Sequence, residues 1–81
     1  MRRHLLSDEE ILAAIIELAD DGFCERGQLV LRFRHVGERD LRRSLNRAAR
    51  HGLLLQRRGP DGRTHFALSS EGWEAMRRQH S

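Results

Sequence analysis

The stretch from Glu38 to Gly52 constrains the fold more than any other part of this chain, because its residues fit a helix with two unlike faces. Leu41, Leu45 and Ala48 fall on one side of a helical wheel, as side chains that cover a core do. Gly52 suits the left-handed conformation that commonly ends a helix. The opposite and flanking positions carry Arg39, Arg42, Arg43, Asn46, Arg47 and Arg50. We therefore expect a helix at about residues 38–51 with one buried face and one strongly basic face.

The positive charge of the chain is concentrated in its middle. Residues 26–63 carry eleven Arg against three acids, whereas residues 1–25 carry two Arg against seven acids and residues 64–81 carry two of each. The formal net charge of +3 therefore conceals a basic block. Such a block, on sequence patterned to fold, is expected of a protein that binds a phosphate backbone. Nucleic acid is the first class of partner to consider.

Length and cysteine usage limit the remaining choices. A chain of 81 residues fits one domain, residues 1–81, with one small core. No apolar run approaches the ~18 residues needed to cross a bilayer, and the acids at positions 8–10 interrupt any signal-peptide core. Cys24 is the single cysteine, which agrees with a reducing compartment. We expect a cytoplasmic, nucleoid-associated protein in which Cys24 is a half-buried core thiol rather than a redox sensor.

The sequence has no recognisable motif of an enzyme or of a metal site. Its five histidines have no zinc-ligand spacing with one another or with the cysteine: His4, His35, His51, His65 and His80. It also lacks a phosphate-binding glycine loop and a nucleophile elbow. We expect no enzymatic activity, no metal, no cofactor, no small-molecule ligand and no membrane partner.

The first helix is predicted over residues 8–20. Ser7 and Glu10 have the spacing of a capping box, and the acids at its start suit the positive end of the helix dipole. Apolar residues then recur at helical spacing: Ile11, Leu12, Ile15, Ile16 and Ala19. The sequence Asp-Asp-Gly at 20–22 ends the helix.

Residues 23–36 carry two competing patterns. Leu29, Phe33 and Val36 recur as a helix requires, whereas Leu29, Leu31 and Phe33 alternate as a strand requires. We favour a short helix at about residues 26–34, preceded by a brief extended pairing at residues 23–24. Residues 35–37 are expected to form a turn.

Two strands and a last helix complete the predicted order. Residues 53–58 and 63–68 are typical of strands around the turn sequence Gly-Pro-Asp-Gly, with Phe66 and Leu68 on one face. A helix follows at about 70–79, capped by Ser69 or Ser70. The predicted fold is mainly α with a small β-hairpin, an α+β class in the order helix-helix-helix-strand-strand-helix.

This order, and the stretch GERDLRRSLNRAARHGLLLQRRGPDGRTHFALSSEGWEAM, resembles the winged helix-turn-helix domains of bacterial regulators of the MarR and PadR kind. In such domains a recognition helix ends in glycine, a basic turn containing Asp-Gly forms the wing, and a strand ending near Leu-Ser leads into a glycine-containing helix. The resemblance implies a recognition helix at about 38–51 and a wing at about 53–68. The chain departs from many MarR-type proteins in having neither their long additional helices nor an effector-binding domain.

The resemblance implies that the recognition helix enters the major groove, where arginine suits the O6 and N7 atoms of guanine. The candidates for base contacts are Arg39, Arg42, Arg43 and Asn46. Arg47 and Arg50 are candidates for phosphate contacts, as are Arg57, Arg58 and Arg63 on the wing, with Arg32 and Arg34 weaker candidates. The alternative is an ordinary solvated helix face, but pairs of arginines four residues apart repel each other, which favours a functional reading.

The leading hypothesis is a double-stranded DNA-binding protein that regulates transcription. A small winged-helix module or inhibitor, of a phage or accessory kind, that binds another macromolecule is the alternative, and an architectural or excision factor that bends DNA is a third. A homodimer through the first and last helices is also expected. Its motivating residues are Leu5, Leu6, Ile11, Ile15, Trp73 and Met76.

Overall fold

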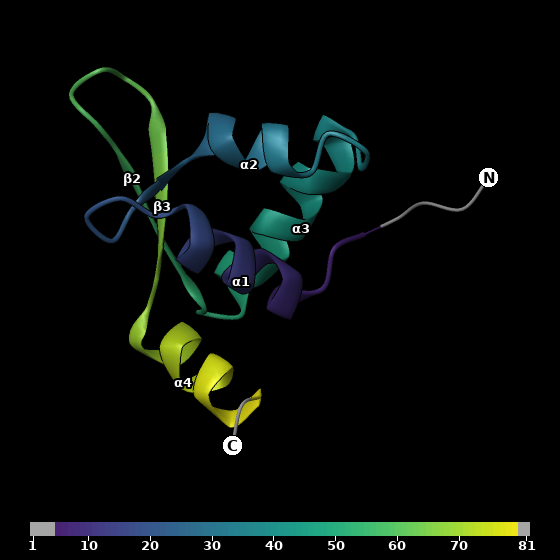
Figure 1. Ribbon diagram of the computed structural model, residues 1–81, viewed down its shortest axis with the longest axis vertical. Coiled ribbons are helices and arrows are strands. Elements are labelled where there is room, and N and C mark those ends of the chain that lie inside the picture. The colour runs from purple at the N-terminus through teal and green to yellow at the C-terminus, as the bar shows by residue number, and fades with distance from the viewer. Residues whose placement is uncertain (1–4, 80–81) are drawn as a thin grey trace.

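The computed structural model describes residues 5–79, which form four helices and one antiparallel sheet of three strands (Figure 1). The elements along the chain are α1 (Asp8–Leu18), β1 (Cys24–Glu25), α2 (Arg26–Arg32), α3 (Glu38–Arg50), β2 (Leu54–Arg58), β3 (Thr64–Leu68) and α4 (Ser70–Gln79). The α+β class predicted from the sequence is confirmed. None of the helices within the described residues is long and apolar enough to cross a bilayer.

Helix α1 begins at the predicted capping box. The backbone N–H of Glu10 donates to the Ser7 hydroxyl, and the Glu10 carboxylate accepts from the Ser7 N–H. The helix ends at Leu18, before an Asp-Asp-Gly turn in which Asp21 has a φ of 53°. Its buried residues are Ile11, Leu12, Ala14 and Ile15. Ile16, which was expected on the core face, is 39% exposed, because the core covers a narrower side of the helix.

Residues 23–36 contain the short helix that we favoured, so the strand alternative over this segment is wrong. Leu29 is fully buried, whereas Leu31 is 73% exposed, because helical rather than alternating geometry decides which side chains meet the core. The expected extended pairing is one residue later, where Cys24 pairs with Phe66 and adds a third strand to the sheet. Cys24 itself is fully buried, not half-buried.

Helix α3 has the two faces that the sequence predicts. Leu41, Leu45 and Ala48 are all at most 3% exposed. The helix follows Gly37, which has a φ of 88°, and ends before Gly52, which has a φ of 76°, a left-handed conformation that glycine adopts without strain. The position of α3 is therefore set by a buried apolar row and by glycines beyond its two ends.

The strands are arranged in the order β1-β3-β2, with β3 in the centre. Strands β2 and β3 pair antiparallel from Leu54 with Leu68 to Arg58 with Thr64, and the turn at 59–62 joins them. Phe66 and Leu68 are buried, as expected. In Figure 1 the loop of this hairpin extends beyond the helices, while α1 lies between α2 and α4.

The start of α4 is hydrogen-bonded to residues 52–53, which connect α3 to β2. The Ser69 hydroxyl accepts from the Gly72 N–H and donates to the Gly52 carbonyl, and the Ser69 N–H donates to the Leu53 carbonyl. A Cβ at Gly72 would overlap that Leu53 carbonyl oxygen, so this close contact requires glycine. Of the two predicted caps of α4, Ser69 is therefore the one that forms.

Three of the six residues that motivated a homodimer lie inside this core. Leu6, Ile11 and Ile15 are at most 1% exposed. Leu5 and Trp73 remain 46% and 48% exposed, and Met76 packs against the edge of the core. Of the six motivating residues, only Leu5, Trp73 and Met76 therefore remain available for a dimer contact.

Candidate nucleic-acid interface

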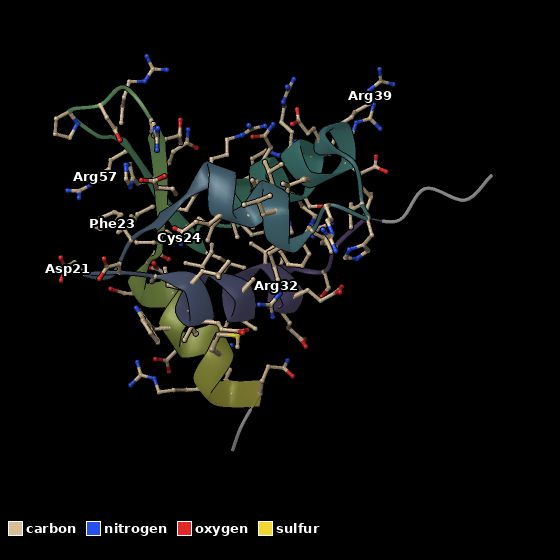
Figure 2. The ribbon with its side chains drawn as sticks, turned by 45° about the horizontal axis from the view of Figure 1, so that its top comes forward. Asp21, Phe23, Cys24, Arg32, Arg39 and Arg57 are labelled. Carbon is tan, nitrogen blue, oxygen red and sulfur yellow. The ribbon has the colours of Figure 1, made fainter. Side chains whose placement is uncertain are left out.

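The outer face of α3 carries polar side chains that have no partner within residues 5–79. The exposed, unpaired side chains are Arg39, Arg42, Arg43, Asn46 and Arg50. Four of them lie opposite the row that contains Leu41 and Leu45, and Arg42 flanks that row. Figure 2 shows Arg39 extending from α3 into solvent. We refer to these five residues as the free face of α3.

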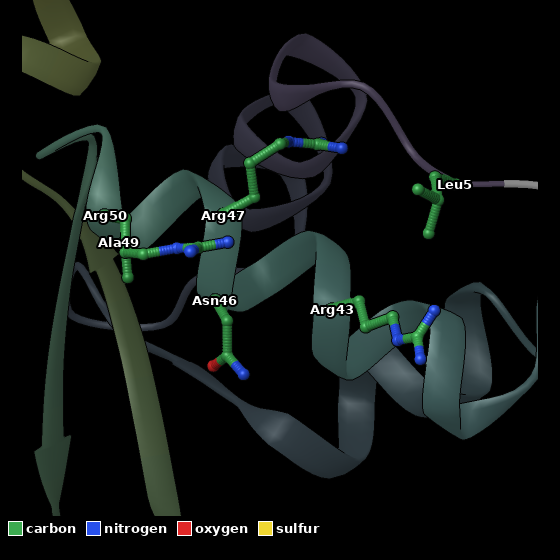
Figure 3. Close-up of a pocket in the computed structure, with 6 residues that line it drawn as sticks. All are labelled: Leu5, Arg43, Asn46, Arg47, Ala49 and Arg50. Atoms are coloured by element: carbon green, nitrogen blue, oxygen red, sulfur yellow. The ribbon is translucent and has the colours of Figure 1, made fainter.

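A groove runs along one edge of the free face (Figure 3). It has a volume of about 810 Å³ and is lined by Leu5, Arg43, Asn46, Arg47, Ala49 and Arg50. Its apolar wall is Leu5, which belongs to the segment before α1. The sequence analysis did not place Leu5 near the arginines, because the contact depends on how the start of the chain packs against α3.

A second, smaller notch joins the free face to the hairpin. It has a volume of about 270 Å³ and is lined by Arg26, Arg42, Leu45, Asn46, Gln56, Thr64 and Phe66. Arg26, at the start of α2, has no ion-pair partner among the described residues and was not a predicted site residue. Arg26 and Arg42 line one notch only because α2 packs against the sheet, so sequence spacing could not reveal this.

Arg47, in contrast, is held by the chain itself. Its Nε lies 3.0 Å from Asp8 Oδ1, and its guanidinium also donates to the Leu6 carbonyl. The other Asp8 oxygen lies 2.8 Å from His51 Nδ1. Partial burial raises the pKa of Asp8, but hydrogen bonds from His51 and Arg47 outweigh it, and the pKa is lowered from its usual value. Arg47 therefore fixes the segment before α1 along α3.

The three hairpin arginines differ in their surroundings. The Arg57 guanidinium lies 3.9 Å from the centre of the Phe23 ring, a cation–π contact that is visible in Figure 2. Arg63 Nη1 lies 3.2 Å from Glu25 Oε2. Arg58 is exposed and has no partner within the described residues. One of the three predicted hairpin contacts is thus fully available to an external anion.

The two weaker candidates, Arg32 and Arg34, also differ in whether they have a partner. Arg32 donates to Glu17 across 2.6 Å, and this hydrogen bond, together with the charge of Arg32, lowers the pKa of Glu17. Arg34 is exposed, with no partner among residues 5–79. In Figure 2 Arg32 lies beside α1, well apart from Arg39.

The buried cysteine has little chemistry to offer. Burial, with a smaller effect from Glu25, raises the pKa of the Cys24 thiol to about 11, so that it stays protonated at neutral pH.

A comparison of the chain with protein-family models, curated proteins and solved structures found no significant match.

Proposed function

We propose that this protein binds double-stranded DNA with a winged-helix arrangement and regulates transcription. In this proposal α3 is the recognition helix in the major groove, and the β2–β3 hairpin is a wing on the backbone or minor groove. The observation that carries the proposal is the free face of α3, whose arginines have no partner among residues 5–79 although acids are available elsewhere in that range.

The charge arrangement of α3 argues against a merely soluble surface. Arg39 and Arg43 are four residues apart on one side of the helix, where like charges destabilise it by a few tenths of a kcal/mol, roughly 0.2 to 0.5. A solvated helix would be more stable with an acid at one of these positions. A polyanion that neutralises both charges gives a reason for the repulsion.

The dimensions of α3 fit a major groove. Thirteen residues span about 20 Å at 1.5 Å per residue, and the groove of B-form DNA, about 12 Å wide, admits one helix. Arg39, Arg42, Arg43 and Asn46 would reach base edges, and Arg50 would meet a phosphate at the far end. Because Arg47 already contacts Asp8, we assign its main role to holding the N-terminal segment.

The hairpin would contribute chiefly through Arg58, the arginine there that has no partner in the described part of the chain. Arg57 and Arg63 would add charge while keeping their contacts to Phe23 and Glu25. The notch lined by Arg26 and Arg42 connects α3 to the hairpin and makes the basic surface continuous.

Fluorescence anisotropy with labelled duplex DNA at 50 and 200 mM salt tests this function. If six or more arginines neutralise phosphates, affinity falls by roughly 10³ to 10⁵ between these concentrations. Arg77→Ala is a matched control, because Arg77 lies on α4 and pairs with Glu74. Folded protein that binds no duplex at low salt would contradict the proposal and favour a protein partner.

We also propose that two copies read a twofold-symmetric site, since a single winged helix contacts few base pairs. Half-sites would be spaced by about one helical turn, ~34 Å. The apolar side chains left for the contact include Leu5 and Trp73. Sedimentation equilibrium at tens of micromolar protein should then show a dimer, whereas a monomer of 9.4 kDa with and without DNA would contradict it.

A further inference from the structure

Three side chains with metal-ligating groups meet where the hairpin joins β1. Glu25 is the last residue of β1 and pairs in register with His65 of β3, and Asp61 reaches back from the turn. One ligand atom from each of the three lies within 4.8 Å of the other two. Strand pairing and the turn create this cluster from residues up to forty positions apart in the sequence, which spacing along the sequence does not reveal.

The separation of these groups suits an ion between them better than a direct hydrogen bond. His65 Nε2 lies 3.8 Å from Asp61 Oδ1, which is too far for a hydrogen bond. Two ligands bound tetrahedrally at metal distances of about 2.0 to 2.2 Å lie roughly 3.3 Å apart. A shift of about half an ångström would bring these two atoms to that spacing. Glu25, at 36% side-chain exposure, already has a carboxylate oxygen within 4.8 Å of both ligand atoms.

Gly59 supports the interpretation independently, because it leaves the space that the imidazole needs. A Cβ at this position would lie 2.8 Å from His65 Nε2 and 3.0 Å from Asp61 Oδ1. Gly59 is not among the residues with positive φ, so its backbone conformation alone does not call for glycine. The missing side chain is what allows the ring nitrogen and the carboxylate to face each other.

The carboxylate of Asp61 is already oriented and ionised. Its Oδ1 accepts from the Arg63 N–H at 2.9 Å, and this hydrogen bond lowers the pKa of Asp61. The His65 side chain is only 18% exposed, which limits its rotation. Two of the three ligands are thus held in place before any ion arrives.

Arg63 at present neutralises the cluster in part. Its guanidinium lies 3.2 Å from Glu25 and 3.7 Å from Asp61 Oδ2, and its side chain is 69% exposed. Two carboxylates and one guanidinium leave a net charge of −1, whereas replacement of the guanidinium by a divalent cation would give zero. Because Arg63 is so exposed, it can turn into solvent at little cost.

We propose that Glu25, Asp61 and His65 bind a first-row divalent cation of the zinc class, in competition with the guanidinium of Arg63. The imidazole nitrogen favours such an ion over Mg²⁺ or Ca²⁺, which prefer an all-oxygen set. The ring nitrogen of His65 binds the ion only when the imidazole is neutral. This site does not depend on the proposed DNA binding and is tested without DNA.

Isothermal titration of Zn²⁺ into chelator-treated, tag-free protein at neutral pH tests the site. His65→Gln should lower the affinity at least about tenfold, the lower end of what even a supporting group contributes to a metal site. Glu25→Gln is the second variant, for use if His65→Gln does not fold. Arg63→Gln should raise the affinity, because it removes the competing cation.

His51→Gln is the matched control. His51 also faces a carboxylate, that of Asp8, but no third ligand completes that pair among the described residues. The His51→Gln variant should bind Zn²⁺ with the same affinity as the unchanged protein. No Zn²⁺ binding, equal binding by His65→Gln, or weaker binding by Arg63→Gln would overturn the proposal.

Discussion

The arginines of α3 and those of the surrounding elements have the same side chain but different electrostatic surroundings. Across the free face, no acidic group of the described residues pairs with a guanidinium. Around it, Arg32, Arg47 and Arg63 each pair with a carboxylate. The difference teaches that a charge count along the sequence overstates how much positive surface a partner can reach.

The cause is the position of the acids. Seven of the twelve lie in residues 8–25, which form α1, the following turn and β1. These elements lie beside α2 and the hairpin, and Asp8 is the one described acid among them that pairs with a side chain of α3. The outer face of α3 therefore stays beyond the reach of the acidic part of the chain.

The largest expected effect concerns the buried row that holds the free face in place. Leu45→Ala should lower the free energy of unfolding by about 2 to 5 kcal/mol, because Leu45 is 3% exposed and its removal leaves a cavity. Urea denaturation followed by circular dichroism measures the change. Leu55→Ala is the control, with an expected change within about 0.5 kcal/mol, since Leu55 is 53% exposed. Equal losses from both variants would contradict the assignment of the faces.

The next effect compares an unpaired arginine with a paired one. Arg43→Ala should weaken binding to a preferred duplex by about 1 to 3 kcal/mol and relax its sequence preference. Arg32→Ala should leave binding unchanged, because Arg32 is engaged by Glu17 away from α3. Anisotropy titrations against a set of duplexes measure both. If Arg32→Ala were the more damaging change, the comparison itself would be wrong.

Within the hairpin the same comparison separates Arg58 from Arg63. Arg58→Ala should weaken binding to all duplexes alike and lower the salt slope by about one. Arg63→Ala should do so less, because Arg63 is shared with Glu25. Titrations at several salt concentrations give the slopes. A change of sequence preference in Arg58→Ala, with none in Arg43→Ala, would reverse the proposed roles of hairpin and helix.

A smaller effect is expected from the Asp8 carboxylate, which holds Arg47, and this effect depends on pH. Asp8→Asn should lower the free energy of unfolding at neutral pH by about 1 to 2 kcal/mol, since it weakens two partly exposed, charge-assisted hydrogen bonds. The folded state lowers the pKa of Asp8 below 3.8, so this stability is present above that value and is lost as pH falls through the folded-state pKa. The two proteins should therefore converge in acid.

Urea denaturation at pH 7, 4 and 3 measures the Asp8 effect. Glu9→Gln is the control, because it removes the same charge from the same helix turn and Glu9 has no partner among residues 5–79. Its effect on stability measures the interaction with the helix dipole alone. A difference between Asp8→Asn and the unchanged protein that is constant with pH would exclude the linkage.

The smallest expected effect belongs to Arg57, which faces a ring instead of a carboxylate. A double-mutant cycle of Arg57→Ala and Phe23→Leu should give a coupling of about 0.5 to 1 kcal/mol, typical of an exposed cation–π pair. The free energies of unfolding come from urea denaturation. A coupling free energy of zero would show that Phe23 does not hold Arg57, which would then count as an unpaired arginine.

Local chemistry explains which parts of the fold were predictable. The Ser7–Glu10 capping box, the left-handed Gly52 and the buried row of α3 depend on residues close in sequence, and all were predicted correctly. The third strand was seen only as a brief pairing, because two residues carry little periodicity. The exposure of Ile16 depends on how wide a side of α1 its neighbours cover, which no pattern within α1 records.

The site was predictable to a lesser degree. The helical wheel predicts that the α3 arginines are exposed, and this is confirmed for all of them except Arg47, which is partly buried. The partner of Arg47 lies 39 residues away, and that of Arg63 lies 38 residues away. Such pairs form only when distant elements pack, so sequence reasoning could identify the basic residues but not separate the occupied ones from the available ones.

The junction of Ser69 and Gly72 with the end of α3 has a mechanical consequence. Because the Gly72 backbone meets the Leu53 carbonyl with no room for a side chain, α4 cannot slide along this connection without breaking the hydrogen bonds of Ser69. The start of α4 is therefore fixed to residues 52–53, the connection that directly follows α3. Trp73, 48% exposed and next to Gly72 in the chain, offers a partner an apolar contact close to this fixed connection.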